Sequence, residues 1–251
     1  HRLPMLHGRS WLRGPPPALI SVGHSMQPVQ KSLKNQFLSA MSAGDFALLG
    51  PHLTAVDLAR GDVLDFPGQT IEYAWFLEDG IASMVIASRD GHEVEAGIIG
   101  REGLIDVATI LGVTKSPLRC FIQIPGHGYR MPAHTLAAAY RASETLRALL
   151  NQFAFSVLIQ IAETALSNAS FSIEERLARW LLMCADRLAG EEIAMTHEFL
   201  SLMLNVRRAG VTLAIQSLQG AGYLESRRGR IRITDRPGLE EFANDAYTAL
   251  R

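Results

Sequence analysis

The sequence predicts an α+β fold: a unit of short antiparallel strands, then a long helix, then a small helical domain with a basic strand pair. Three observations predict it. Glycines cut the segment from Leu53 to Pro132 into short apolar runs, residues 133–168 contain neither Gly nor Pro, and two helical patterns and a hairpin pattern follow Gly190. Strands and helices segregated along the chain in this way are typical of α+β proteins.

Composition limits the classes to which the protein can belong. The 251 residues carry a formal net charge of −1, so a nucleic-acid surface must be a local patch. The two cysteines, Cys120 and Cys184, are too few for a disulfide framework or a Cys-ligated iron–sulfur or zinc site, and they suit a reducing compartment. No apolar run reaches the roughly 18–20 residues of a membrane span. We therefore expect a cytoplasmic protein without a membrane partner.

The first 142 residues fall into two parts with different sequence patterns. Residues 1–29 lack the apolar core of a signal peptide and include Pro15 to Pro17, so we expect a poorly ordered tail. Residues 30–142 are predicted to form an antiparallel β domain, a sandwich or barrel, after a weakly helical start. Asp90-Gly91 predicts a hairpin between IASMVIAS and HEVEAGII, and Glu72–Leu77 and Cys120–Ile124 are further predicted strands.

A long helix is predicted over residues 143–170. Its apolar positions recur every three or four residues, at Leu146, Leu150, Phe153, Val157 and Ile161. Such a stripe packs either on the chain's own β domain or on the same helix of a second subunit. The pattern alone leaves both alternatives open. Ser172 with Glu175 then predicts a capping box that starts the next helix.

The last part of the chain predicts a winged helix-turn-helix. Thr196 is a suitable N-cap for a first helix, Asn205-Val206 forms the turn, and a second helix covers about residues 207–220. Residues 227–230 are predicted to form the tip of a hairpin between YLES and IRIT. From Thr196 to Thr234 there are six arginines and two acids, which is a basic patch in a chain of net charge −1.

This basic patch predicts contact with DNA. Arginines at a helix N-terminus oppose the helix dipole unless an anion neutralises them there. Arg208 is suited to bidentate contact with guanine, the wing arginines to phosphates, and exposed Ala209 and Leu213 to thymine methyl groups. The alternative is a ligand-binding or signalling protein whose winged helix contacts proteins. The candidate DNA contacts are Thr196, Arg207, Arg208, Ala209, Thr212, Leu213, Arg227, Arg228 and Arg230.

From about Gln30 to Leu239 the sequence resembles the Crp/Fnr family of bacterial transcription regulators. The segments that carry the resemblance are SIEERLARWLL, MTHEFLSLMLNVRRAGVTLAIQSLQGAGYL, RGRIRITD, GIIGREGLID and PLRCFIQIPG. The resemblance implies a jelly-roll β-roll of the cyclic-nucleotide-binding type as sensor (residues 30–142), a dimerisation helix (143–170) and a winged helix-turn-helix (171–251). It also implies a homodimer on a palindromic DNA site, with RNA polymerase as a further partner.

The sensor half departs from the family's cyclic-nucleotide binders. In them a Gly-Glu pair holds the ribose and an Arg-Ser/Thr pair holds the phosphate; here these positions read Ile105-Asp106 and Arg119-Cys120. These four residues are the candidate effector pocket. We therefore expect no cofactor, and an effector that is not cyclic AMP. A haem ligand (His92, His127 or His134) and a thiol switch are weaker alternatives. The sequence contains no HxH pair and no Ser/His/Asp pattern, so neither a metal site nor an enzyme is expected.

Overall fold

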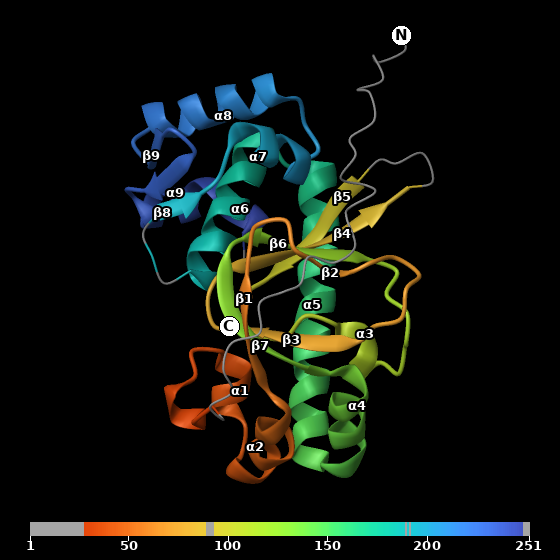
Figure 1. Cartoon of the computed structure of the whole chain (residues 1–251). Coiled ribbons are helices and arrows are strands. Elements are labelled where there is room, and N and C mark those ends of the chain that lie inside the picture. Colours follow the sequence, from red (N-terminus) through yellow and green to blue (C-terminus); the bar gives the residue numbers. More distant parts are fainter. Residues whose placement is uncertain (1–27, 89–92, 189, 191, 248–251) are drawn as a thin grey trace.

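The computed structural model describes residues 28–88, 93–188, 190 and 192–247. Figure 1 shows a β domain in the middle, a long helix beside it, and a small domain of helices and short strands at one end. This arrangement confirms the predicted α+β fold. The predicted tail up to residue 27 and the Asp90-Gly91 turn lie outside the described residues.

The β domain is a roll of two antiparallel sheets. The first has the strand order β1-β7-β3 and the second β2-β6-β4-β5. Gly80, with a φ of +88°, turns β3 into β4, and an added Cβ would lie 2.6 Å from the Ile124 carbonyl oxygen, so only glycine fits there. The strands are β1 Thr54–Leu58, β2 Val63–Asp65, β3 Tyr73–Leu77, β4 Ile81–Ala87, β5 Glu93–Ile99, β6 Arg119–Ile124 and β7 Gly126–Pro132.

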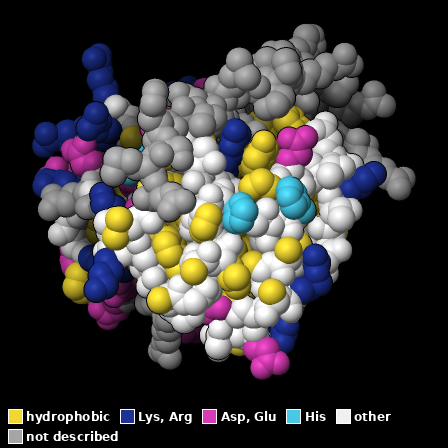
Figure 2. All heavy atoms as spheres, turned by 60° about the horizontal axis from the view of Figure 1, so that its bottom comes forward, with side chains coloured by type: hydrophobic (Ala, Val, Ile, Leu, Met, Phe, Trp, Pro, Cys, Tyr) yellow, Lys and Arg dark blue, Asp and Glu magenta, His cyan; other side chains and the backbone are white. Residues whose placement is uncertain are grey.

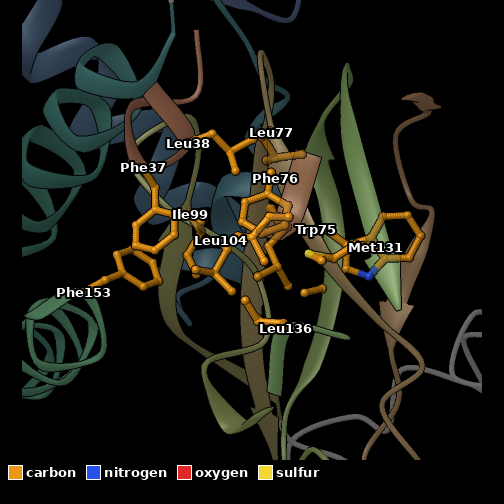
Figure 3. Close-up of a cluster of buried hydrophobic side chains, with 14 of the residues drawn as sticks. Phe37, Leu38, Trp75, Phe76, Leu77, Ile99, Leu104, Met131, Leu136 and Phe153 are labelled. Carbon is orange, nitrogen blue, oxygen red and sulfur yellow. The ribbon is translucent and has the colours of Figure 1, made fainter. Parts of the chain in front are cut away.

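Aromatic and aliphatic side chains from both sheets, the first helix and the long helix fill the roll (Figure 3). The Phe37 ring lies 5.8 Å from the Phe153 ring and 6.4 Å from the Phe76 ring, centroid to centroid. The long helix therefore closes the core of the roll. The short helices around it are α1 Gln36–Ala40, α2 Ala43–Leu49, α3 Val107–Ile110 and α4 Ala133–Ala142, with 3₁₀ turns at Gln30–Ser32 and Gly50–His52.

The long helix is α5, Glu144–Ser170, which starts after a break in the Gly- and Pro-free segment. Ser143 has an extended backbone, and its hydroxyl accepts the Leu146 N–H and so caps α5. Among the described residues, α5 is the one helix long and apolar enough to cross a membrane by length and composition.

The apolar stripe predicted for a helix pair lies against the chain's own β-roll. Leu146, Leu150, Phe153 and Val157 are buried in the roll's core, and Ile161 packs at its edge. Leu146, Leu150, Phe153 and Val157 are therefore not available as contacts to a second subunit, and Ile161, which is partly buried, stays a prediction. The open face of α5 is a second apolar stripe, which consists of Phe155, Leu158, Ile159 and Leu166, exposed by 62%, 58%, 42% and 53%.

The terminal domain begins with α6, Ile173–Arg187, and its capping box is present: the Ser172 hydroxyl accepts the Glu175 N–H, and the Glu175 carboxylate accepts the Ser172 N–H. The remaining elements follow the predicted order of helix, helix and strand pair. They are β8 Glu192–Ala194, α7 His197–Met203, α8 Arg208–Gly220, β9 Leu224–Arg227, β10 Arg230–Ile233, α9 Arg236–Ala243 and a 3₁₀ turn Asn244–Ala246.

The terminal domain is docked on the roll, not held by a linker alone. Sheet residues of β4, β5 and β6 share one buried cluster with α6, α7 and α8. Phe121 of β6 meets Phe199 of α7 edge-on at 6.2 Å, and Arg60 Nη2 donates to the Ala194 carbonyl at 2.8 Å. The end of the molecule away from α8, with α1, α2 and α4, faces the viewer in Figure 2. Hydrophobic and histidine side chains gather there, and the described charged side chains lie mostly at the rim.

Candidate nucleic-acid interface

The helix-turn-helix is formed by α7, a four-residue turn and α8. The Thr196 hydroxyl accepts the Phe199 N–H at the start of α7. Asn205 turns the chain with a φ of +50°, a conformation that Asn tolerates better than most residues. Arg207 is the N-cap of α8, but its side chain does not cap the helix. Backbone N–H groups in the first turn of α8 can therefore donate hydrogen bonds to an anion.

One face of α8 packs on the domain, and the opposite face is open. Val211, Ala214, Ile215 and Leu218 are buried, as the sequence predicts. Ala209, Leu213 and Gln216 lie on the open face, and Leu213 is 64% exposed. Figure 1 shows α8 along one end of the molecule with no other element outside it. The helix can therefore enter a groove without any movement of the rest of its own domain.

Arginines without acidic partners gather at the start of α8 and at the tip of the wing. Within the described part of the chain, Arg207, Arg208 and Arg228 are exposed and make no ion pair. Arg207 and Arg208 stand at the positive end of the helix dipole, which disfavours them by a few tenths of a kcal/mol to about 1 kcal/mol. A bound phosphate or base edge reverses that balance.

The other wing arginines have acidic neighbours. Arg230 pairs with Glu192 at 2.8 Å, and both Arg227 and Arg232 approach Glu225, at 3.5 and 3.1 Å. Glu192 lies on β8, outside the segment from Thr196 to Thr234 in which arginines outnumber acidic residues. The free positive charge of the wing is therefore smaller than the sequence count suggests, and Arg228, beside Gly229, makes no ion pair with any residue that the structure describes.

Two polar side chains of α8 lie at the interface. The Thr212 hydroxyl donates to the Arg208 carbonyl at 3.1 Å and also lies 3.1 Å from His197 Nδ1. Thr212 therefore joins α8 to α7, and the prediction missed His197 as its partner. Gln216 is exposed on the same helix face as Ala209 and Leu213, as its spacing from them predicts.

Comparison with known families identifies this domain. Residues 175–242 match the family model of the Crp-like helix-turn-helix domain. The C-terminal domain is a Crp-like helix-turn-helix domain. The match runs from the first turn of α6 to α9 and includes the wing. No curated protein matches this chain.

Solved structures share the fold of the whole chain. FixK2 from Bradyrhizobium japonicum has a TM-score of 0.66 at 16% identity, covering 79% of this chain and 99% of FixK2. The c-di-GMP-responsive regulator CLP of Xanthomonas campestris has a TM-score of 0.61 at 13% identity, covering 76% and 99%. TTHA1359 of Thermus thermophilus, a transcriptional regulator of the CRP/FNR family, has a TM-score of 0.60 at 20% identity, covering 75% and 97%. The predicted helix-turn-helix is thus confirmed as a Crp-like domain, and the chain as a whole shares the fold of these regulators.

The four residues predicted for an effector pocket each take part in the packing of the β-roll. Ile105 is fully buried in the core, and Arg119 is paired with Glu93 at 2.9 Å and stacked 4.5 Å above the Phe121 ring. Asp106 caps α3 through the Thr109 N–H, and Cys120 is buried in β6. A cavity of about 370 Å³ between α5 and α6 and another of about 700 Å³ beside α3 and α4 have linings that include none of the four.

Buried carboxyl and thiol groups of the roll have altered pKa values. Burial, together with the neighbouring charge of Asp106, raises the pKa of Asp65 to about 7, and burial raises the pKa of Asp106 to about 6. Burial also raises the pKa of Cys120 and Cys184, which leaves both thiols protonated and poorly reactive. Among the described residues there is no cluster of three or more His, Cys, Asp or Glu side chains that could hold a metal ion.

Proposed function

We propose that the protein is a homodimer that binds a palindromic DNA site, with one α8 in the major groove of each half-site. The observation that carries this proposal is the open face of α8, with unpaired Arg207 and Arg208 at its head. Two recognition helices related by a two-fold axis read two half-sites about 34 Å apart, one turn of B-DNA. A single domain of this size would read too few base pairs to select one site in a genome.

The second subunit is proposed to lie on the open face of α5. Phe155, Leu158 and Ile159 are exposed, and the pattern continues through Ala162 to Leu166 at spacings of three and four residues. The small alanines between the large side chains allow two helices to approach closely. Insertion of α5 into a membrane would pull Leu146 to Val157 out of the core of the roll, so a protein partner fits this face better.

The contacts to DNA follow from which side chains are free. Arg208 is assigned to a guanine edge, because it stands at the first position of α8, where recognition helices contact bases. Arg207 and Arg228 are assigned to phosphates. Ala209 and Leu213 are assigned to thymine methyl groups. The Thr196, Arg227 and Arg230 side chains are assigned to the DNA backbone around them, as the sequence predicts.

The β-roll is proposed to carry the regulatory input. Gly103, in a segment that resembles the family's β-roll, has no room for a Cβ because the Phe153 ring would lie 1.8 Å from it. With this turn closed by α5 and Arg119 already paired with Glu93, an effector other than a cyclic nucleotide is the better proposal. A cytoplasmic location and contact with RNA polymerase go with this role.

The test measures dimerisation and DNA binding on the same samples. Sedimentation velocity of the full chain at micromolar concentration is expected to give a dimer, and Leu158→Asp, a charge on the open face of α5, a monomer. Leu48→Asp, at an exposed apolar position on α2, is the control and should remain dimeric. The dimer should bind duplex DNA with an affinity that falls steeply with salt. A monomeric wild-type chain, or DNA binding insensitive to salt, would contradict the proposal.

A further inference from the structure

A carboxyl group lies buried between the β-roll and the DNA-binding domain. Glu95 belongs to β5 of the roll, and its side chain points to α6 of the terminal domain. The Trp180 indole N–H donates to Glu95 Oε1 at 2.9 Å, and the Ser83 hydroxyl donates to Oε2 at 2.6 Å. One carboxyl oxygen thus bonds its own sheet, and the other bonds the domain that carries α8.

Charged and sulfur-containing side chains from the helices packed against β5 surround Glu95. On α6, Arg179 and Arg187 act electrostatically on the carboxyl group, and the buried Cys184 thiol lies near it. Arg187 is bound to Glu102 at 2.6 Å, and Arg179 to Glu163 of α5 at 3.9 Å. Both arginines thus already have closer acidic partners. From α7, Met203 Sδ lies 3.7 Å from the Ser83 oxygen.

Other contacts show that the docked arrangement contains both favourable and unfavourable groups. Apolar residues of both domains form one cluster, which favours docking. Gln123 of β6, however, is fully buried, and within the described part of the chain neither its amide nitrogen nor its amide oxygen has a hydrogen-bond partner. A buried amide without partners disfavours the state that buries it. The balance between docked and undocked domains can therefore be shifted by one further group.

We propose that Glu95 is a proton-linked latch that holds the DNA-binding domain on the β-roll. The neutral carboxyl group fits the docked site: its hydroxyl donates to the Ser83 oxygen, the Ser83 hydrogen turns to Met203 Sδ, and Oε1 still accepts the Trp180 N–H. Undocking removes α6 and exposes Glu95 to water, which favours the carboxylate. Docking therefore takes up a proton.

The pH range over which the docking equilibrium should change includes physiological pH. Burial raises the pKa of Glu95 to about 7 in the docked state, although hydrogen bonds from Ser83 and Trp180 and the charges of Arg179 and Arg187 act to lower it. In the undocked state we expect the ordinary glutamate value of about 4.3. Since the docked state binds the proton more tightly, docking is strengthened as pH falls from about 8 to 6. The equilibrium constant for undocking should be about tenfold larger at pH 8 than at pH 6.

Hydrogen exchange of the full chain tests the latch. Amide exchange in β5 and α7, corrected for the intrinsic effect of pH, is measured at pH 6 and pH 8. The wild type should exchange about tenfold faster at pH 8 than at pH 6. Glu95→Gln imitates the neutral carboxyl group, so it should lose this difference and remain protected at both values. Trp180→Phe removes the N–H donor together with part of a buried ring, so it should exchange faster at both values, which gives a second variant if Glu95→Gln folds poorly.

Asp65→Asn is the matched control. Asp65 is also a buried carboxyl group with a raised pKa, but it lies inside the roll, opposite Cys120 on β6. This variant should keep the tenfold change in β5 and α7. If Glu95→Gln keeps the wild-type pH dependence, or if Asp65→Asn abolishes it, the latch is refuted. The test involves no DNA, so its outcome is independent of the proposed DNA contacts.

Discussion

Replacement of Arg208 by alanine is expected to change which DNA the protein selects without damaging its fold. Arg208 is exposed, makes no ion pair among the described residues and opens α8 at the positive end of the helix dipole. Its removal leaves no cavity and no unpaired partner, and relief of the dipole repulsion is worth about 0.3–1 kcal/mol. The Tm should therefore stay the same or rise slightly.

The size of the expected change in DNA affinity follows from the geometry of the contact between Arg208 and guanine. A bidentate arginine–guanine pair discriminates by about 1–3 kcal/mol, or about 5- to 150-fold in Kd. The assay first enriches a binding site from random duplexes and then measures Kd for that site and for a scrambled duplex at one fixed salt concentration. Arg208→Ala should weaken binding to the selected site by this factor and relax the choice at one base pair per half-site. Binding to the scrambled duplex should change by much less.

Arg228→Ala is the control for a phosphate contact. Arg228 lies at the tip of the wing, exposed and without an ion pair in the described chain. Its removal should weaken binding to both duplexes alike and lower the slope of log K against log salt by about 1 for each phosphate that is no longer neutralised. If Arg208→Ala weakens both duplexes equally, Arg208 contacts phosphate and the assignment of base reading is refuted.

Three further predictions follow from the same structure. Uracil in place of one thymine per half-site should weaken binding several-fold in the wild type and not in Leu213→Ala; equal losses in both proteins would exclude the methyl contact. In chemical denaturation, the free energy of unfolding should fall as pH rises from about 4.5 to 7 and then level off, because burial raises the Glu95 pKa to about 7. The fall due to Glu95 is about 3 kcal/mol. If Glu95→Gln shows the same fall, another group causes it. Cyclic AMP at millimolar concentration should leave the Tm unchanged, because Phe153 closes the turn at Gly103; a shift of several degrees would show binding.

The helix-turn-helix was predictable because its signals are local. The capping box at Ser172 and Glu175, the N-cap Thr196 and the turn at Asn205 each depend on residues within four positions of one another. The buried positions of α8 follow from the 3.6-residue period in the same way. The pairing of Arg230 with Glu192 was not predictable, since 38 residues separate them and only the β8–β10 register brings them together.

The packing of α5 shows why the sequence left two alternatives open. The helix is apolar on two faces, one with Leu150 and Phe153 and the other with Phe155 and Leu158. A periodic apolar pattern indicates that a helix face is buried, but it does not indicate which partner covers that face. The roll takes the first face because its open side presents Phe37, which itself packs on Phe76, to Phe153. The predicted effector residues stay a prediction. Arg119 and Cys120 lie on β6, whereas Asp106 caps α3, and only the packing of these elements decides which of them meet.

The position of the DNA-binding domain decides whether two recognition helices can reach one site. If α5 forms the dimer axis, each α8 is held at a distance from that axis set by how α6 and α7 sit on the roll. Two successive major grooves on one face of B-DNA accept only a spacing near 34 Å. Docking through Glu95 and Trp180 fixes one such distance. If the proposed latch leaves the docked and undocked arrangements within a few kcal/mol of each other, an input worth about 1–3 kcal/mol can change which arrangement dominates. The interface between the roll and α6 is then where we expect an effector, or a proton, to act on DNA binding.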